Sequence, residues 1–402
     1  MAYKNKNTTK KYSSNSANTG KNALRCEIFG KCGGCQYIDR DYEEQLKLKY
    51  DMLSRLMAPY GKLESVIGMD KPEFYRNKVN ATFKRLKSGE IIAGTYEEGT
   101  HNVLRVKECI LEDKRAQGII KSICTLISSF KIELYNEDKA FGLLRHVMVR
   151  TAKNTGQIMV VLITAAPVFP SKKNFIKALT DMHPEITTIV QNVNSRHTSM
   201  VLGDRNNVLY GKGYIEDVLC GKRFRISPTS FYQINPVQTE KLYNKAMEFA
   251  GLTGRETMID AYCGTGTIGI IASDYAKEVI GVELNKDAIR DANVNARMNS
   301  VKNISFYNND AGKFMVNLNK DIDVVFMDPP RSGSSEQFLQ SVIRLSPKRI
   351  VYISCGPESL ARDLKYLTRK SSFMVDKIAA FDLFPWTEHV ETVCLLSRKV
   401  PV

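Results

Sequence analysis

The chain has 402 residues, of which 43% are hydrophobic and 25% are charged, a composition typical of a globular protein with two or three domains. It contains no apolar run long enough to span a bilayer, and no apolar core follows the lysines of its N-terminus, so we expect a cytoplasmic protein without a membrane segment or a secretory signal. Its 58 Lys and Arg against 43 Asp and Glu give a net charge of +15, which favours a nucleic-acid partner, although a solvated basic surface would have the same composition.

The N-terminal region divides into a tail and a cysteine-rich segment. Residues 1–24 are mostly Lys, Asn, Ser and Thr and predict a flexible basic tail. Residues 25–58 form the next segment, whose cysteines lie at its start and whose residues 42–57 have the spacing of an amphipathic helix. Nine cysteines in a chain without an export signal indicate metal ligands, nucleophiles or buried thiols rather than disulfides.

Residues 59–215 predict a central α+β domain that binds RNA. Short runs with strand character lie between turn residues, at 78–86, 90–97, 146–153, 157–165 and 186–194. Residues 114–130 and 171–182 predict helices packed against them. We expect a mixed, largely antiparallel sheet.

Residues 216–402 predict an α/β domain with a Rossmann-like, doubly wound sheet. Strand-like runs alternate with amphipathic helical stretches, at 257–262, 278–284, 304–310, 323–330, 349–355 and 391–398. In such a sheet ligands bind at the carboxyl ends of the strands.

A glycine-rich turn follows the first of these strands. Gly264, Gly266 and Gly269 match the G-x-G-x-x-G fingerprint of dinucleotide-binding proteins, and this pattern alone would also suit an NAD-dependent oxidoreductase. Asp260 stands directly before the glycines, where a carboxylate would repel a pyrophosphate. The same carboxylate would attract the positive amino group or sulfonium of S-adenosylmethionine, and we therefore expect a class I S-adenosylmethionine site.

Two further acidic residues end the next two strands. Glu283 is placed to accept hydrogen bonds from the ribose hydroxyls, and Asp310 is placed to contact the adenine. Solvated acids at strand ends would look the same in the sequence.

Two further segments with chemically informative residues are Asp328-Pro-Pro-Arg331 and Ser354-Cys355-Gly-Pro357. Each follows a buried strand, and the prolines fix the backbone there. Cys355 precedes a candidate helix, whose N-terminus would lower the thiol pKa. Carbon 5 of uracil needs activation before it accepts a methyl group, and attack of a thiolate on carbon 6 provides it. A base must then remove the proton of carbon 5, and Glu391 is our candidate.

Together with Phe231-Tyr-Gln233-Ile-Asn235, these motifs stand in one order, and the chain resembles the RNA uracil-5-methyltransferase family. The family includes bacterial 23S rRNA enzymes and the tRNA T-loop enzyme. The resemblance implies that Gln233, Tyr262, Glu283 and Asp328 contact S-adenosylmethionine. Asp260, Gly264 and Asp310 are cofactor-binding candidates from their positions at the strand ends and the glycine turn, and the family signature fixes Asp310 less firmly. It also implies that Cys355 is the nucleophile and Glu391 the proton acceptor.

The resemblance extends to the N-terminal cysteines. Cys26-x5-Cys32-x2-Cys35, with Cys109 farther along, is similar to the [4Fe-4S] motif of the rRNA branch. Zinc is the alternative for four cysteines. Because the tRNA enzyme generally lacks this motif, it favours 23S rRNA as the substrate. Many family members carry an OB-like domain before the cluster, and only 25 residues precede Cys26, so we expect the RNA to be bound mainly by the cluster segment and the central domain.

A loop uridine is the expected target, since its base can be flipped out at low cost. Phe231 and Phe384 are candidate walls for that base. The alternatives are a tRNA uridine methyltransferase, an amino-methyltransferase that uses Asp-Pro-Pro, and a non-catalytic iron–sulfur RNA-binding protein. No obligate protein partner is evident.

Overall fold

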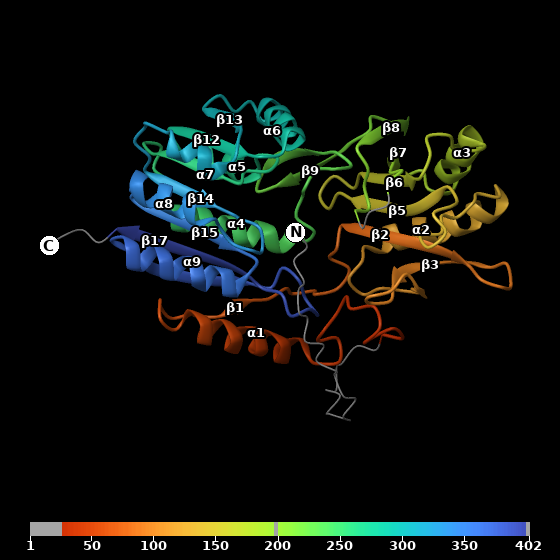
Figure 1. Ribbon diagram of the computed structural model, residues 1–402, viewed down its shortest axis with the longest axis horizontal. Helices are drawn as coiled ribbons and strands as arrows, with labels where there is room; N and C mark the ends of the chain where they lie inside the picture. The colour runs from red at the N-terminus through yellow and green to blue at the C-terminus, as the bar shows by residue number, and fades with distance from the viewer. Residues whose placement is uncertain (1–25, 197–199, 399–402) are drawn as a thin grey trace.

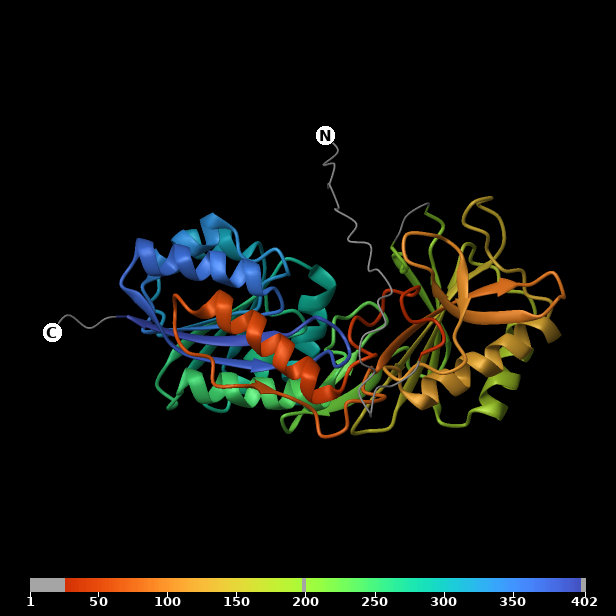
Figure 2. The same ribbon diagram turned by 90° about the horizontal axis from the view of Figure 1, so that it is seen from below.

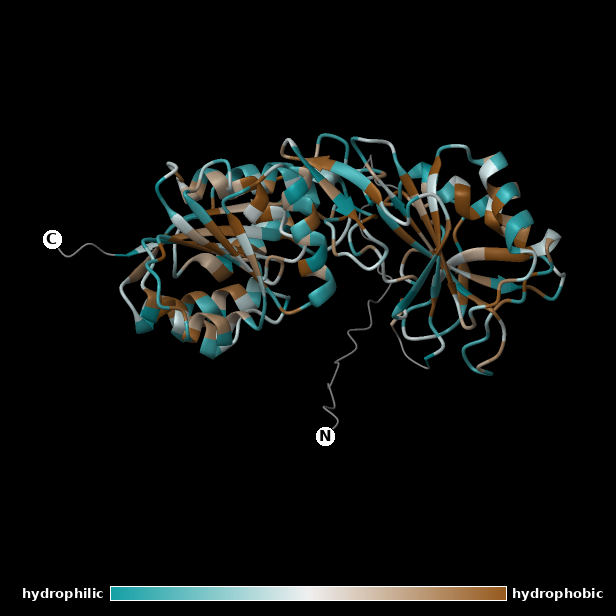
Figure 3. Ribbon diagram, turned by 90° about the horizontal axis from the view of Figure 1, so that it is seen from above, coloured by the Kyte–Doolittle hydropathy of each residue, from teal (hydrophilic) through white to brown (hydrophobic). Residues whose placement is uncertain are grey.

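The computed structural model describes residues 26–196 and 200–398, so the tail predicted for 1–24 lies outside the described residues. Two lobes lie along the long axis of the molecule, each built on a sheet (Figure 1). Hydrophobic residues follow the strands of both sheets, and hydrophilic ones follow the outer surfaces of the helices (Figure 3). No helix in the described part of the chain is both long and apolar enough to cross a membrane.

The central lobe contains a seven-stranded sheet in the order β4-β3-β2-β5-β6-β7-β8. All its neighbours pair antiparallel except β6 and β7, which confirms the mixed, largely antiparallel sheet. Helices α2 and α3 cover one face through an apolar cluster. The elements are β2 (Lys78–Arg85), β3 (Ile91–Tyr96), β4 (Val103–Arg105), α2 (Lys114–Ser129), β5 (Leu144–Thr151), β6 (Ile158–Thr164), α3 (Lys172–Met182), β7 (Ile186–Val193) and β8 (Arg205–Tyr210).

The C-terminal lobe contains an eight-stranded sheet in the order β1-β16-β17-β15-β14-β11-β12-β13. Strands β11 to β15 are parallel, and β17 runs antiparallel between β15 and β16. This is the predicted α/β methyltransferase architecture. The strands are β1 (Val66–Ile67), β11 (Thr257–Ala261), β12 (Glu278–Glu283), β13 (Ile304–Asn308), β14 (Val324–Met327), β15 (Arg349–Ser354), β16 (Phe373–Phe381) and β17 (Glu391–Arg398).

Helices cover both faces of this sheet, because alternate residues of its strands are buried on opposite sides. One face packs against α4 (Pro236–Ala250), α5 (Thr267–Ala272) and α6 (Lys286–Met298). The other packs against α7 (Ala311–Val316), α8 (Glu336–Leu345), α9 (Pro357–Lys370) and the N-terminal helix α1 (Tyr42–Met57). Helix α1 therefore belongs to the C-terminal lobe in space, although it precedes the central sheet in the chain (Figure 2). Strand β1 also belongs to this lobe, because it pairs with β16, although it falls within the range predicted for the central domain, 59–215.

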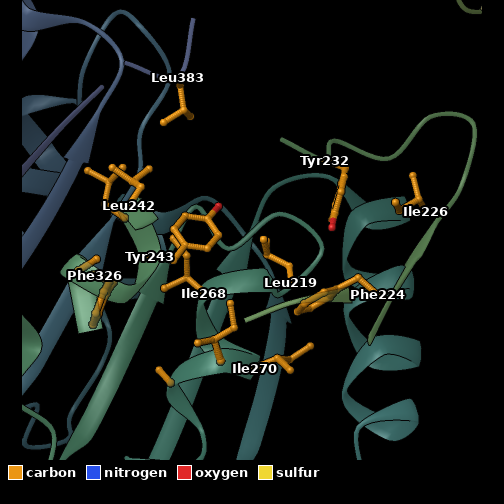
Figure 4. Close-up of a cluster of buried hydrophobic side chains, with 14 of the residues drawn as sticks. Leu219, Phe224, Ile226, Tyr232, Leu242, Tyr243, Ile268, Ile270, Phe326 and Leu383 are labelled. Carbon is orange, nitrogen blue, oxygen red and sulfur yellow. The ribbon is translucent and has the colours of Figure 1, made fainter. Parts of the chain in front are cut away.

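A hairpin of β9 (Ile215–Leu219) and β10 (Lys222–Ile226) joins the lobes. Its buried Asp217 accepts backbone hydrogen bonds from Lys153 and Asn154, in the turn after β5. On its other side, the backbone amide of Arg225 donates to Asn295 of α6. One apolar cluster runs from the uncovered face of the central sheet through this hairpin to α4 and α5, so the two lobes share a continuous core. Figure 4 shows the part of this cluster between the hairpin and the two helices.

Candidate active site

The glycine-rich turn brings Asp260 to the end of β11 and fixes it there. Gly264 and Gly266 have φ values of 54° and 81°, a left-handed conformation that glycine adopts without strain. One oxygen of Asp260 accepts a hydrogen bond of 2.8 Å from the backbone amide of Gly269, and the other oxygen is buried without a partner. The pKa of Asp260 is raised to about 8, first by burial and then by Asp328 and Glu283, although the hydrogen bond from Gly269 lowers it. A buried carboxylate with a free oxygen is suited to a cationic ligand.

Glu283 and Tyr262 line the same turn. The carboxylate of Glu283 accepts from the backbone amides of Gly264 at 3.1 Å and Asn285 at 2.7 Å, so it is held at the end of β12. Tyr262 has a φ of 64°, which is rare for a residue with a side chain, and its ring packs against Phe338 at 5.2 Å. Asp310 instead caps α7 through the backbone amide of Lys313. The predicted residues of the methyl-donor site therefore surround one sheet edge, although Asp310 already has a structural partner.

Asp328 follows β14 on a loop that packs against the segment after β15. Gly356 allows this packing, because a Cβ atom there would lie 2.7 Å from the carbonyl oxygen of Arg331. The hydroxyl of Ser359 donates to the same carbonyl at 2.9 Å. The two proline-containing segments are thus held against each other, and Asp328 and Cys355 emerge from adjacent strands.

The pairing of β15 with β17 brings Cys355 and Glu391 together. Ser354 lies opposite Thr392 in the antiparallel register, so the next pair in that register is Cys355 with Glu391. Glu391 is 5% exposed, and Cys355 is half-buried at the open end of the strand. The predicted nucleophile and base, 36 residues apart in the chain, are neighbours in the structure.

The charges around Cys355 act against its ionisation. Burial raises its pKa to about 11, with further contributions from Glu391 and Asp328, while Arg331 lowers it. The lowered thiol pKa that we expected from the helix N-terminus is therefore wrong for the protein without ligands, because burial and two carboxylates outweigh the dipole of α9. Burial, followed by Asp328, also raises the pKa of Glu391 well above its usual range. A positive ligand nearby would favour the ionised, reactive forms of both groups.

Sequence analysis missed Tyr243, which lies at the centre of this group. It is 3% exposed on α4, and Figure 4 shows its ring beside Leu242 and Ile268. Burial raises its pKa well above the usual range, with Asp328 as the next cause, and its side chain is hydrogen-bonded to Gln233. Tyr243 looks like an ordinary core residue of an amphipathic helix in the sequence, so no local pattern could have identified it.

The two predicted wall residues differ in exposure. Phe231 is 69% exposed, beside the Gln233 segment. Phe384 is half-buried, and its ring lies edge-on to His389 at 6.0 Å. Phe231 is therefore available to a base from solution, whereas Phe384 also packs against the apolar core.

A pair of cations lies on the face of the central sheet that looks toward the catalytic lobe. Lys78 stands directly opposite Arg150 in the β2–β5 register, on the side of the sheet where Met148 joins the shared core. Arg150 is 4% exposed and donates to the backbone carbonyl of Ser230 at 2.6 Å. The pKa of Lys78 is lowered to about 8, first by burial and then by Arg150 and Arg76. Like charges in opposed positions repel, so this arrangement favours an anionic ligand.

The four predicted cluster cysteines lie near one another, because Cys35 and Cys109 pack against the same apolar cluster and Cys26 and Cys32 also act on the Cys35 thiol. The pKa of Cys35 is raised to about 12, first by burial and then by the thiols of Cys109, Cys32 and Cys26. Among the described residues, however, no three or more His, Cys, Asp or Glu side chains converge closely enough to hold a single metal ion. The thiols are therefore close enough to affect one another, but they do not form a group that could hold one metal ion.

The chain matches known proteins over almost its whole length. Residues 41–399 match the family model for tRNA (uracil-5-)-methyltransferases. An RNA methyltransferase of Halalkalibacterium halodurans is 41% identical over 93% of this chain and 83% of its own length. One of Clostridium tetani is 43% identical over 92% of this chain and 82% of its own.

A solved structure is also similar to this fold. It is the tRNA (uracil-54, C5)-methyltransferase of Pyrococcus abyssi in complex with S-adenosyl-L-homocysteine, with a TM-score of 0.77 and 29% identity. The similarity covers 90% of this chain and 85% of that one.

Proposed function

Since the chain belongs to the tRNA (uracil-5-)-methyltransferase family, and is thus an S-adenosylmethionine-dependent RNA methyltransferase, we propose that it methylates carbon 5 of a loop uridine in 23S rRNA, with Cys355 as nucleophile and Glu391 as base. The observation that carries the mechanism is the register of β15 and β17, in which Cys355 and Glu391 form the next pair after Ser354 and Thr392. A nucleophile and a base on adjacent strands can act on neighbouring carbons of one pyrimidine ring.

The reaction begins with the thiol of Cys355, whose proton goes to solvent. The Sγ atom bonds to carbon 6 of the uracil, and the ring electrons move to form an enolate with an electron-rich carbon 5. S-adenosylmethionine supplies the methyl group that carbon 5 then receives. The carboxylate of Glu391 takes the proton from carbon 5, the double bond re-forms and the carbon–sulfur bond breaks. Reprotonation of the Cys355 thiolate and loss of the proton from Glu391 restore the enzyme, so the net products are 5-methyluridine, S-adenosylhomocysteine and one proton.

The methyl donor would be held by residues at the carboxyl ends of β11, β12 and β14. Asp260 and Asp328 offer negative charge to its cationic portion, and Glu283 offers a carboxylate for the ribose. Gln233 and Tyr262 flank them, and Gly264 leaves room for close approach. The positive charge of the ligand would also oppose the two carboxylates that raise the Cys355 pKa. Binding of the methyl donor and activation of the Cys355 thiol would therefore be coupled.

The test of this mechanism is covalent capture. RNA that carries 5-fluorouridine at the target has no removable proton on carbon 5, so the enzyme should remain attached to it in a complex that survives denaturation. Cys355→Ala should form no such complex, while still binding S-adenosylmethionine. Methyl transfer to uridine RNA by the Cys355→Ala protein would exclude the mechanism.

A tRNA substrate is the second candidate, because the Pyrococcus abyssi protein similar to this chain acts on uracil 54 of tRNA. The cysteine-rich segment favours rRNA through the family resemblance. Incubation of the enzyme with 23S rRNA fragments and with tRNA transcripts, followed by mapping of 5-methyluridine, separates the two. Methylation of tRNA alone would reject the rRNA proposal and leave the chemistry intact.

We propose that Cys26, Cys32, Cys35 and Cys109 hold a [4Fe-4S] cluster. The mutual influence of their thiols supports this, and so does Arg76, whose positive charge lowers the pKa of both Cys35 and Cys109. Each cysteine of a cubane binds a different iron, so its ligands stand farther apart than the four ligands of one zinc ion.

A further inference from the structure

A buried ion pair connects the N-terminal helix to the segment that leads into Glu391. The Nζ atom of Lys49 on α1 lies 2.6 Å from the Oδ1 atom of Asp382, and both side chains are 0% exposed. Lys49 also donates to the backbone carbonyl of Phe384 at 3.2 Å. The hydroxyl of Tyr42 donates to the second oxygen of Asp382 at 3.0 Å. Helix α1 therefore holds two points of residues 382–390, which we call the β16–β17 loop.

The same helix holds the tip of this loop. The backbone amide of Trp386 donates to the side-chain oxygen of Gln45 at 2.7 Å, and its carbonyl accepts from the amides of Gln36 and Tyr37 at 3.0 and 3.1 Å. Its indole nitrogen donates to the carbonyl of Pro72 at 2.8 Å. Trp386 has a φ of 70°, a conformation that costs free energy and persists only where the surroundings impose it.

The loop is connected to the base over a very short path. Asp382 follows Phe381, which lies opposite Glu391 in the β16–β17 register, and Glu391 is the first residue of β17. The position of Glu391 is thus set by the strand pair on one side and by the anchored loop on the other. Any shift of the loop at Asp382 acts on the strand position opposite the base.

A buried ion pair seldom makes a fold more stable than a well-packed apolar pair would, because both charges lose their hydration. A buried ion pair does fix the relative orientation of the two segments that it joins, since the charges and their hydrogen bonds allow few arrangements. We propose that Lys49 is a positioning residue for Glu391, and that α1 acts through the β16–β17 loop to place the base for removal of the carbon 5 proton. This inference rests on the proposed function.

The reaction offers a measurement that separates positioning from folding. Capture by 5-fluorouridine RNA requires Cys355 and the methyl donor but no proton removal. Turnover on uridine RNA requires Cys355, the methyl donor and removal of the carbon 5 proton. A variant with a misplaced base should therefore capture 5-fluorouridine RNA normally, but it should release uridine RNA slowly. Ordinary uridine RNA, which the intact enzyme releases, should then remain attached.

Lys49→Met keeps most of the side-chain volume and removes the charge. We expect this variant to capture 5-fluorouridine RNA at the rate of the unaltered enzyme. Its turnover should fall by about 10²-fold, the loss expected when a catalytic group is misplaced by about 1 Å. It should also accumulate a complex with uridine RNA that survives denaturation. Lys49→Arg, which retains the charge, should recover part of the turnover. Gln45→Leu loses only the contact with Trp386 and should likewise keep normal capture but lose turnover. This variant replaces Lys49→Met as the test if Lys49→Met does not fold.

The outcomes distinguish the inference from the function on which it rests. Equal losses in capture and turnover, or no loss in either, would show that the ion pair serves the fold alone and would overturn the inference. Failure of the unaltered enzyme to capture 5-fluorouridine RNA would instead reject the proposed mechanism.

Discussion

Asp260 and Gly269 are joined by a hydrogen bond of 2.8 Å that ties the carboxylate at the end of β11 to the backbone of α5. The bond uses one oxygen only, and the second oxygen is buried without a partner. The geometry thus leaves one carboxyl oxygen of Asp260 free at the sheet edge, where we propose that the methyl donor binds.

Asp260→Asn should weaken binding of S-adenosylmethionine by about 10- to 100-fold, the usual value of a hydrogen bond to a charged group. The amide oxygen of Asn can still accept from Gly269, so the fold should be retained. Because the pKa of Asp260 is raised to about 8, affinity in the unaltered protein should increase from pH 6 to pH 8 as the carboxyl ionises, by at most about tenfold per pH unit. Titration calorimetry at several pH values measures both effects. The same pH dependence in Asp260→Asn would assign it to another group.

The reactivity of Cys355 should respond to the bound methyl donor. With a pKa raised to about 11, the free thiol is almost entirely protonated at pH 7, so its alkylation by iodoacetamide should accelerate about tenfold per pH unit up to that value. A cationic ligand beside Asp328 should lower the pKa and speed alkylation at fixed pH. Mass spectrometry of the peptide that contains Cys355 gives the rate. S-adenosylhomocysteine, which lacks the sulfonium charge, is the control, and an equal acceleration by both ligands would contradict the electrostatic explanation.

The local pattern predicted most of the catalytic lobe, because buried parallel strands are short apolar runs that end in turn residues. Helix α1 has the bounds that its spacing predicted, residues 42–57. Strand β16 was not predicted, since its charged residues Asp376 and Lys377 interrupt the alternation where the register shifts. What no local pattern could reveal is contact across the chain. Lys49 looks like a solvated lysine on a helix until the fold places Asp382 against it.

Glu391→Gln should retain attack and methyl transfer but lose release, because an amide cannot accept the proton of carbon 5. Turnover should fall by about 10²- to 10⁴-fold, the usual contribution of a general base, and a covalent complex with uridine RNA should accumulate. Gel electrophoresis under denaturing conditions detects it. A Glu391→Gln protein that turns over normally would require another base, and Asp328 would be the next candidate because its charge reaches both Glu391 and Cys355.

Reconstitution of the protein with iron and sulfide under reducing conditions should give about four irons per chain, as expected for one cubane. Cys35→Ser should lower the iron content, because Cys35 interacts with all three other thiols. Cys124→Ser is the matched control, a half-buried cysteine on α2 outside the group. Elemental analysis supplies the measurement. Stoichiometric zinc, with no iron retained, would reject the cluster in favour of a zinc site.

The cation pair on the central sheet should bind RNA through a phosphate. Lys78 and Arg150 are opposed in register, and neither forms an ion pair with a carboxylate in the described residues, so an RNA phosphate would relieve their repulsion. Lys78→Gln should weaken RNA binding and reduce the slope of log affinity against log salt concentration by about 1, the effect of one lost phosphate contact. Lys173→Gln, on the exposed surface of α3, is the control and should leave the slope unchanged. The measurement is RNA binding by filter retention at several salt concentrations, with S-adenosylmethionine affinity as a check on the fold. An unchanged slope in Lys78→Gln would place the phosphate contacts elsewhere, since a lysine that binds no phosphate releases no counterion.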